Sequence, residues 1–108
     1  MASQVPKEVY EAEKLKNPRV RIVEHMEEQI LLRPAKRLEW KKYRIMAVDT
    51  DPNVKSLALE SLLTTTTVWP DQAGLSALLD EYPGFAEVMG KQAAILSGGF
   101  TDAEVKKA

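Results

Sequence analysis

The sequence predicts a small α+β domain dominated by helix, in which a β-hairpin is followed by three to four amphipathic helices. Two short β-prone runs lie close together near the N-terminus, apolar residues recur at helical spacing over most of the remaining chain, and proline or glycine separates these segments. A chain of 108 residues supports one hydrophobic core. We expect a helical segment over residues 1–18 that shares a single core with a domain over residues 19–99, and a flexible tail over residues 100–108.

The first helix and the hairpin are predicted from propensity and from alternation. Residues 7–16 favour helix, and an asparagine–proline pair ends the segment. Residues 19–25 and 29–33 predict two strands joined by a short polar connection over residues 26–28. This connection lacks an Asn-Gly or Asp-Gly pair, so the strand register stays open. A hairpin alone is marginal in water, so we expect it to lie on the helices or to pair with another chain.

A helix is expected over residues 35–48, directly after Pro34. Its apolar residues recur at helical spacing and define two adjoining apolar faces, and three cations recur on the far side as a basic stripe. The first apolar face contains Trp40, Tyr43 and Ala47, the adjoining face contains Leu38, Ile45 and Met46, and the stripe contains Arg37, Lys41 and Arg44.

Two aspartates are expected to cap later helices. Asp51 stands directly before a proline and predicts a helix over residues 53–63. The four residues from Thr64 to Thr67 are β-branched and disfavour helix, so we expect an extended connection from there to Pro70. Asp71 is then placed to cap the next helix.

Apolar stripes predict the last two helices. The earlier helix carries Leu75, Leu78, Leu79 and Tyr82 at the spacing i, i+3, i+4, i+7, and a proline–glycine pair ends it. The final helix ends at a pair of glycines. Its predicted apolar face contains Phe85, Val88, Met89, Gln92, Ile95 and Leu96.

The sequence offers few residues for catalysis. It has no cysteine, which excludes disulfides, thiolate zinc sites and a cysteine nucleophile. His25 is the only histidine and is expected to be exposed at the hairpin turn, where Glu24, Glu27 and Glu28 form a solvated turn rather than a metal site. No glycine-rich phosphate loop and no nucleophile elbow is present. We expect no enzyme activity, no cofactor and no metal.

Charge is distributed unevenly along the chain, although the net charge is only -1. Residues 33–44 contain six basic residues and one acid, a local charge of +5, whereas residues 71–104 contain six acids and one base, a local charge of -5. Three interpretations stay open: two solvated faces or patches that meet within the fold, a bipolar surface that steers a partner or a second copy, and DNA contact through the basic helix. The two carboxylates of Asp49 and Asp51, at the end of this basic segment, argue against nucleic acid.

These charges, together with two aromatic residues, define the candidate partner-binding surface. Aromatic residues at helical spacing or beside proline are expected in the core, but one or two could line a groove for a partner helix. The candidate residues are Arg33, Arg37, Lys41, Arg44, Trp69 and Tyr82.

The sequence also predicts where the protein works. The N-terminus lacks the apolar core of a signal peptide, and no stretch reaches the roughly 18 apolar residues of a membrane span. We therefore expect a soluble, cytoplasmic protein without a membrane partner.

The order of the elements carries a family resemblance. The hairpin ends in Leu31-Leu32-Arg33-Pro34, a basic helix follows, an extended Val68-Trp69-Pro70-Asp71 precedes a leucine-rich helix that ends at Tyr82-Pro83-Gly84, and a last helix runs to a glycine stop. Over roughly residues 7 to 99, this order resembles the small tail-assembly chaperone proteins of tailed bacteriophages and prophages. The resemblance implies a protein without a cofactor that binds the long, aggregation-prone tape-measure protein in the host cytoplasm and is not expected in the finished particle.

Two other functions stay open beside the chaperone. The chain could be a structural or adaptor component of a virion or other assembly that uses the hairpin edge for strand addition between copies. It could also be a small DNA-binding regulator that uses the basic helix over residues 35–48.

Overall fold

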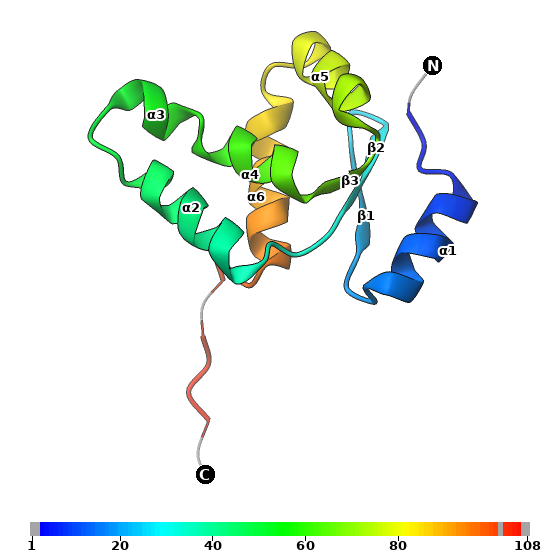
Figure 1. Cartoon of the computed structure of the whole chain (residues 1–108), viewed down its shortest axis with the longest axis horizontal. Coiled ribbons are helices and arrows are strands. Elements are labelled where there is room, and N and C mark those ends of the chain that lie inside the picture. The colour runs from blue at the N-terminus through cyan, green and yellow to red at the C-terminus, as the bar shows by residue number, and fades with distance from the viewer. Residues whose placement is uncertain (1–2, 102, 107–108) are drawn as a thin grey trace.

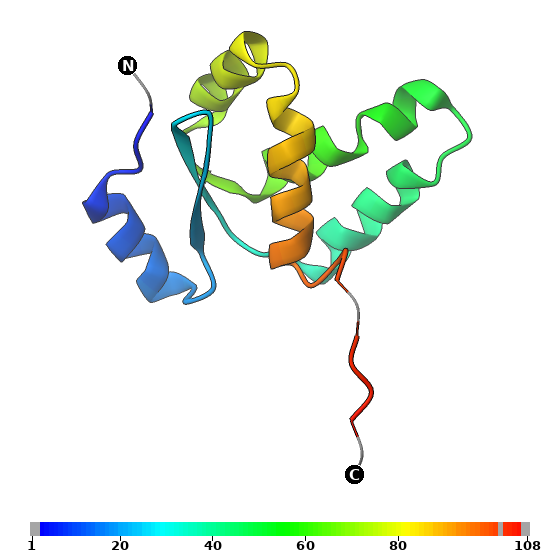
Figure 2. The ribbon, with the colours of Figure 1, turned by 180° about the vertical axis from the view of Figure 1, so that it is seen from behind.

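A three-stranded antiparallel sheet lies between one N-terminal helix on one side and the remaining helices on the other, as two opposite views show (Figures 1 and 2). The computed structural model describes residues 3–101 and 103–106. The predicted α+β class, mainly α with a hairpin near the start, is confirmed. Along this part of the chain the elements are α1 (Lys7–Lys16), β1 (Arg21–His25), β2 (Glu28–Leu32), α2 (Arg37–Ala47), α3 (Pro52–Ser56), α4 (Ala58–Thr66), β3 (Thr67–Trp69), α5 (Gln72–Glu81) and α6 (Phe85–Leu96).

The two faces of the sheet belong to separate apolar clusters. Ile30 and Leu32 point toward α2, α4, α5 and α6 and join the main core, which is built around Leu62, Phe85 and Met89. Leu31 points the other way and, with other fully or partly buried apolar residues, forms a smaller cluster under α1. This alternation follows from the two-residue period of a strand. The other members of the smaller cluster are Val5, Val9, Tyr10, Val20, Val68 and Trp69.

A two-residue turn fixes the hairpin register that the sequence left open. His25 pairs with Glu28 across the turn, and Arg21 pairs with Leu32 at the other end of the two strands. The turn residues Met26 and Glu27 have φ values of 55° and 65°. Two successive left-handed residues are typical of the type I′ turn, whose twist matches that of the strands. Asparagine and glycine normally occupy these positions, so the turn could not be recognised from residue type.

Replacing Met26 by asparagine together with Glu27 by glycine should therefore stabilise the protein. Both substituents adopt left-handed backbone at lower steric cost, and we expect the free energy of unfolding to rise by roughly 1 kcal/mol. Urea unfolding followed by circular dichroism measures the change. Glu27→Gln keeps the strained backbone and is the matched control. An equal or lower stability of the double variant would show that the turn is not of this type.

The predicted helix end at the threonine run was wrong. α4 continues through Thr66, and only Thr67 to Trp69 is extended, where it forms a third strand paired with β2. The hydroxyls of Thr65, Thr66 and Thr67 each donate to the carbonyl four residues earlier, at 2.9, 2.9 and 2.7 Å. These side-chain bonds satisfy the three hydroxyls within the chain, so the last turn of the helix accommodates threonines. The predicted single helix over residues 53–63 also divides at Leu57 into α3 and α4.

Both predicted aspartate caps are confirmed. One oxygen of Asp51 accepts from the amide of Asn53 at 2.9 Å, and one oxygen of Asp71 accepts from the amide of Gly74 at 2.8 Å. Each cap satisfies one of the amides that a helix start leaves without a backbone partner. Local capping chemistry therefore placed these two helix starts correctly.

Two predicted apolar faces are only partly buried. On α2, Tyr43 is buried, but Leu38 and Ile45 are 76% and 68% exposed. On α6, Val88, Gln92 and Ile95 are exposed, although all three are among the residues of its predicted apolar face. The buried face of α6 consists mostly of small residues, which let this helix approach α4 closely. Its members are Phe85, Ala86, Met89, Gly90, Ala93 and Ala94.

The last described residues form neither helix nor strand. Phe100 is 54% exposed and its ring centroid lies 6.3 Å from that of Tyr43. The expected tail over residues 100–108 lies partly outside the described residues, since Asp102, Lys107 and Ala108 are not among them.

Candidate partner-binding surface

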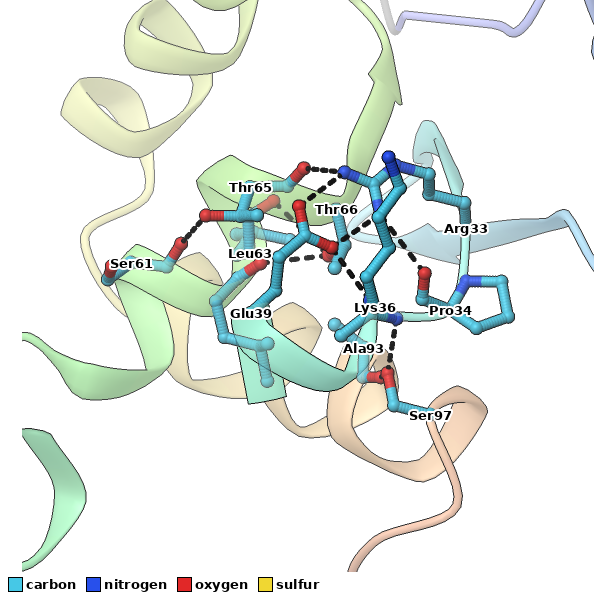
Figure 3. Close-up of polar contacts among 12 residues, drawn as sticks. Arg33, Pro34, Lys36, Glu39, Ser61, Leu63, Thr65, Thr66, Ala93 and Ser97 are labelled. Carbon is cyan, nitrogen blue, oxygen red and sulfur yellow. Dashed lines mark hydrogen bonds and ion pairs between the residues drawn. The ribbon is translucent and has the colours of Figure 1, made fainter. Parts of the chain in front are cut away.

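A polar junction at the start of α2 holds this helix against α4. The guanidinium of Arg33 donates to both carboxylate oxygens of Glu39, at 2.8 and 2.9 Å, and to the carbonyl of Thr65 at 3.0 Å (Figure 3). The backbone amide of Lys36 donates to the same carboxylate at 2.7 Å. Such a bidentate pair fixes orientation as well as distance. Arg33, proposed from sequence as a partner contact, thus lies in the junction that positions α2.

The same junction reaches α6 through a serine. The amide of Ala35 donates to the hydroxyl oxygen of Ser97 at 2.8 Å, and that hydroxyl donates to the carbonyl of Ala93 at 2.7 Å (Figure 3). The segment before α2 is therefore tied to the ends of both α4 and α6. These contacts give α2 a fixed position on the helical layer.

The junction has a clear electrostatic signature. The hydrogen bonds from Arg33 lower the pKa of the Glu39 carboxyl from its ordinary value of 4.5 to about 2. The same hydrogen bond raises the pKa of the Arg33 guanidinium. A carboxyl whose pKa is lowered by folding stabilises the fold above its unfolded pKa, and that contribution disappears as the pH falls through the folded pKa.

The variant Glu39→Gln should consequently show a pH-dependent loss of stability. We expect the difference in unfolding free energy between wild type and variant to be largest above pH 4.5 and to shrink as the pH approaches about 2. Urea unfolding at a series of pH values measures it. When Arg33→Gln is already present, the stability difference caused by Glu39→Gln should no longer depend on pH in this way. A difference that stays constant over the whole range would contradict the assigned pair.

The exposed side of α2 is both apolar and basic. At about 100° per residue, Leu38 and Ile45 fall on one line along the helix, two turns apart. The basic stripe Arg37, Lys41 and Arg44 lies beside this line, and Lys42 lies on its other side. We call these six residues the α2 outer face. Val48, which follows the helix and is 65% exposed, extends the face at its C-terminal end.

The cations of the α2 outer face are available to a partner. All four are exposed, and so is the neighbouring Lys36. Among residues 3–101 and 103–106, none of these five cations pairs with a carboxylate, and no ion pair joins the basic segment to the acidic one. The interpretation in which the two oppositely charged segments meet within the fold therefore has no support in the described part of the chain.

The other two aromatic candidates lie away from α2. Trp69 ends β3, pairs in register with Leu31 and packs into the cluster under α1. Tyr82 follows α5 and lies 6.5 Å from the ring of Phe85, near the hairpin turn. The carboxylates of Glu81, Glu28 and Glu27 raise the pKa of the Tyr82 hydroxyl, with Glu81 the largest cause. The six residues proposed from sequence thus divide into four places, and only Arg37, Lys41 and Arg44 share one surface.

The hairpin turn differs from the expected exposed turn. Glu28 is only 6% exposed and accepts a hydrogen bond from the amide of Ser3. The ring of His25 lies 5.9 Å from that of Phe85 and is partly buried. Within the described ranges, no group of three or more potential metal ligands is present.

A groove between the end of α3, α4 and the start of α6 has a volume of about 370 Å³. Leu57 and Pro83 lie along it, but its charged residues are two lysines and two glutamates, namely Lys55, Lys91, Glu60 and Glu87. Because the positive and negative charges are equal in number, the groove favours neither an anionic nor a cationic ligand. The groove therefore gives a weaker candidate site than the α2 outer face.

Sequence reasoning missed Leu38 and Ile45 as surface residues. The signal was present, because both residues lie between cations when α2 is drawn as a helix, whereas core residues seldom have charged neighbours on both sides. No described helix has the length and apolar character needed to cross a membrane. Comparison of the chain with protein-family models, with curated proteins and with solved structures finds no match.

Proposed function

We propose that the protein is a non-enzymatic binding module that covers exposed apolar segments of a partner protein. The observation that carries this proposal is the α2 outer face, where Leu38 and Ile45 are 76% and 68% exposed on one side of the helix and lie between exposed cations. Aliphatic residues that are exposed together and rimmed by charge are typical of protein-interaction sites. The junction of Arg33 with Glu39 supports this role because it holds the face in a fixed position.

The resemblance to phage tail-assembly chaperones supplies the first partner to test. A chaperone of this kind would work in the host cytoplasm without a cofactor and would cover apolar stripes of the tape-measure protein before the tail is built. A long helical client presents many such stripes, and each needs only a small apolar surface to cover it. The proposal therefore predicts binding to several sites along one client.

Co-expression with a phage tape-measure protein tests the proposal. The soluble fraction of the client should rise, and the two proteins should purify together. The variant Leu38→Ser with Ile45→Ser should lose this effect, whereas Leu15→Ser should keep it. Leu15 is 89% exposed on α1 and is a matched control for the removal of an exposed leucine. An unchanged client solubility with the wild-type protein would count against the chaperone.

A second candidate function rests on the free edge of the sheet. The strand order is β1-β2-β3, and the carbonyl of Ser3 accepts from the amide of Gln29, so the N-terminal segment continues the β3 side of β2. The outer edge belongs to β1, where the tight turn directs the backbone groups of Ile22 and Glu24 outward. Strand addition between copies at this edge would suit a structural component. Sedimentation at micromolar concentration should then show a chain or ring, and a strict monomer would remove this alternative.

A further inference from the structure

We infer that the α2 outer face recognises an amphipathic helix whose apolar stripe is flanked by aspartate or glutamate. This inference rests on the proposed binding function and names the chemistry of the partner segment. Leu38 and Ile45 are separated by seven residues, or roughly 10 Å along the axis, which matches two turns of a partner helix. The exposed line they form requires an apolar residue on the partner at each turn.

The cations of the α2 outer face determine which charge the partner helix must carry. Arg37, Lys41 and Arg44 border the apolar line on one side, and Lys42 borders it on the other. Glu39, the only acid of α2, is held by Arg33 and faces the junction rather than the partner. A partner helix that places carboxylates on both sides of its apolar stripe would meet cations along both borders.

The helical form of the partner follows from the backbone of α2. An α-helix uses its amides and carbonyls internally, so its side offers no backbone groups to an extended peptide. A partner helix satisfies its own backbone in the same way and contributes side chains only. α2 lies at the periphery of the helical layer in both views, so a helix can approach it along its length (Figures 1 and 2).

Two other occupants fit this face less well. A nucleic acid would pair with the cations but would place phosphates against Leu38 and Ile45, which would gain nothing from them. A second copy that used its own α2 would bring like charges together. A second copy that used its acidic end, where Asp80 and Glu81 close α5, remains an outcome that the test must separate.

Fluorescence anisotropy with labelled synthetic helices tests the inference on the full chain. The first peptide carries leucines at i, i+3, i+4 and i+7 flanked by glutamates. The second keeps the leucines and replaces the glutamates by lysines, and the third keeps the glutamates and replaces the leucines by serines. Only the first peptide should bind well, and its affinity should fall as salt is raised.

Matched variants locate the site. Arg37→Glu with Lys41→Glu and Arg44→Glu should weaken binding of the first peptide by about tenfold or more and should improve binding of the second. The control changes the same number of charges on α1, with Lys7→Glu, Lys14→Glu and Lys16→Glu, and should bind as wild type does. All six lysine and arginine positions are exposed, so both variants should keep the circular dichroism spectrum of the wild type.

The outcomes separate the two proposals. If both leucine peptides bind equally and both lose binding in Leu38→Ser with Ile45→Ser, the acidic partner is wrong and the binding module stands. If binding does not depend on any residue of the α2 outer face, both proposals fail. If the serine peptide or a DNA duplex binds as tightly as the first peptide, the face recognises polyanions in general and the inference of a helical partner is wrong. If the protein self-associates and the double variant Asp80→Lys with Glu81→Lys abolishes this, the face binds a second copy and the inference is overturned.

Discussion

Replacement of Leu62 by alanine should lower the free energy of unfolding by about 2–5 kcal/mol. Leu62 is 2% exposed and belongs to the main core, where α4 packs against both α2 and α6. Removing its isobutyl group leaves a cavity that well-packed neighbours cannot fill completely. Urea unfolding followed by circular dichroism measures the loss.

Leu57→Ala is the matched control for this experiment. Leu57 is 51% exposed at the break between α3 and α4, so its truncation should cost well under about 1 kcal/mol. Leu79→Ala should fall between the two, because Leu79 is only partly buried against the core. Equal losses at positions 62 and 57 would mean that the core does not lie where α4 meets α6.

Replacement of Gly90 by alanine should also destabilise the fold, by about 1–3 kcal/mol. A Cβ atom at this position would lie 2.8 Å from the carbonyl oxygen of Leu59 and 2.9 Å from its Cβ. Because one of these atoms is backbone, the strain can be relieved only by separating α6 from α4. Alanine has the higher intrinsic helix propensity, so a loss of stability would have to come from this close approach.

Gly84→Ala provides the comparison for this glycine. Apart from atoms of the adjoining backbone, nothing lies within 4 Å of the Cβ position at Gly84, and its φ of -74° is accessible to alanine. This variant should be neutral or more stable by roughly 0.4–1 kcal/mol, because alanine restricts the unfolded chain. If the Gly90→Ala variant were as stable as the Gly84→Ala variant, α4 and α6 would not pack as closely at Gly90 as the structure shows.

Several elements could be predicted because their signals are local. α1 begins and ends where propensity and the asparagine–proline pair placed it, and the caps at Asp51 and Asp71 start α3 and α5. Gly98 has a φ of 92°, the left-handed conformation expected of a glycine that ends a helix. In each case the determining residue lies within a few positions of the feature it determines.

Other features depended on contacts between distant segments. The apolar face of α6 was predicted from the positions of its large side chains. In the structure α4 approaches closely, and the small residues Gly90, Ala93 and Ala94 are buried instead. β3 forms because Thr67 and Trp69 reach the open side of β2, which sequence spacing does not reveal. The buried face of α6 and the formation of β3 both depend on which distant segments pack together, and local sequence patterns do not encode this.

The candidate surface was predicted in part. The basic stripe of α2 was recognised from its spacing and is exposed as expected. Arg33 was grouped with it by charge alone, although its carboxylate partner is only six residues away. Leu38 and Ile45 were placed on an apolar face of this helix but were not included in the candidate surface, because residue type alone does not distinguish exposed from buried aliphatic residues. The apolar half of the surface therefore became visible only in the folded chain.

Nuclear magnetic resonance with the isotope-labelled full chain and the acidic amphipathic peptide tests the central claim most directly. The account predicts that the largest amide shift changes fall on residues 37–48, with small changes in α1 and at the hairpin turn. Shift changes centred on the groove that contains Leu57, on the acidic end at Glu81, or on the β1 edge would contradict the assignment of partner binding to α2.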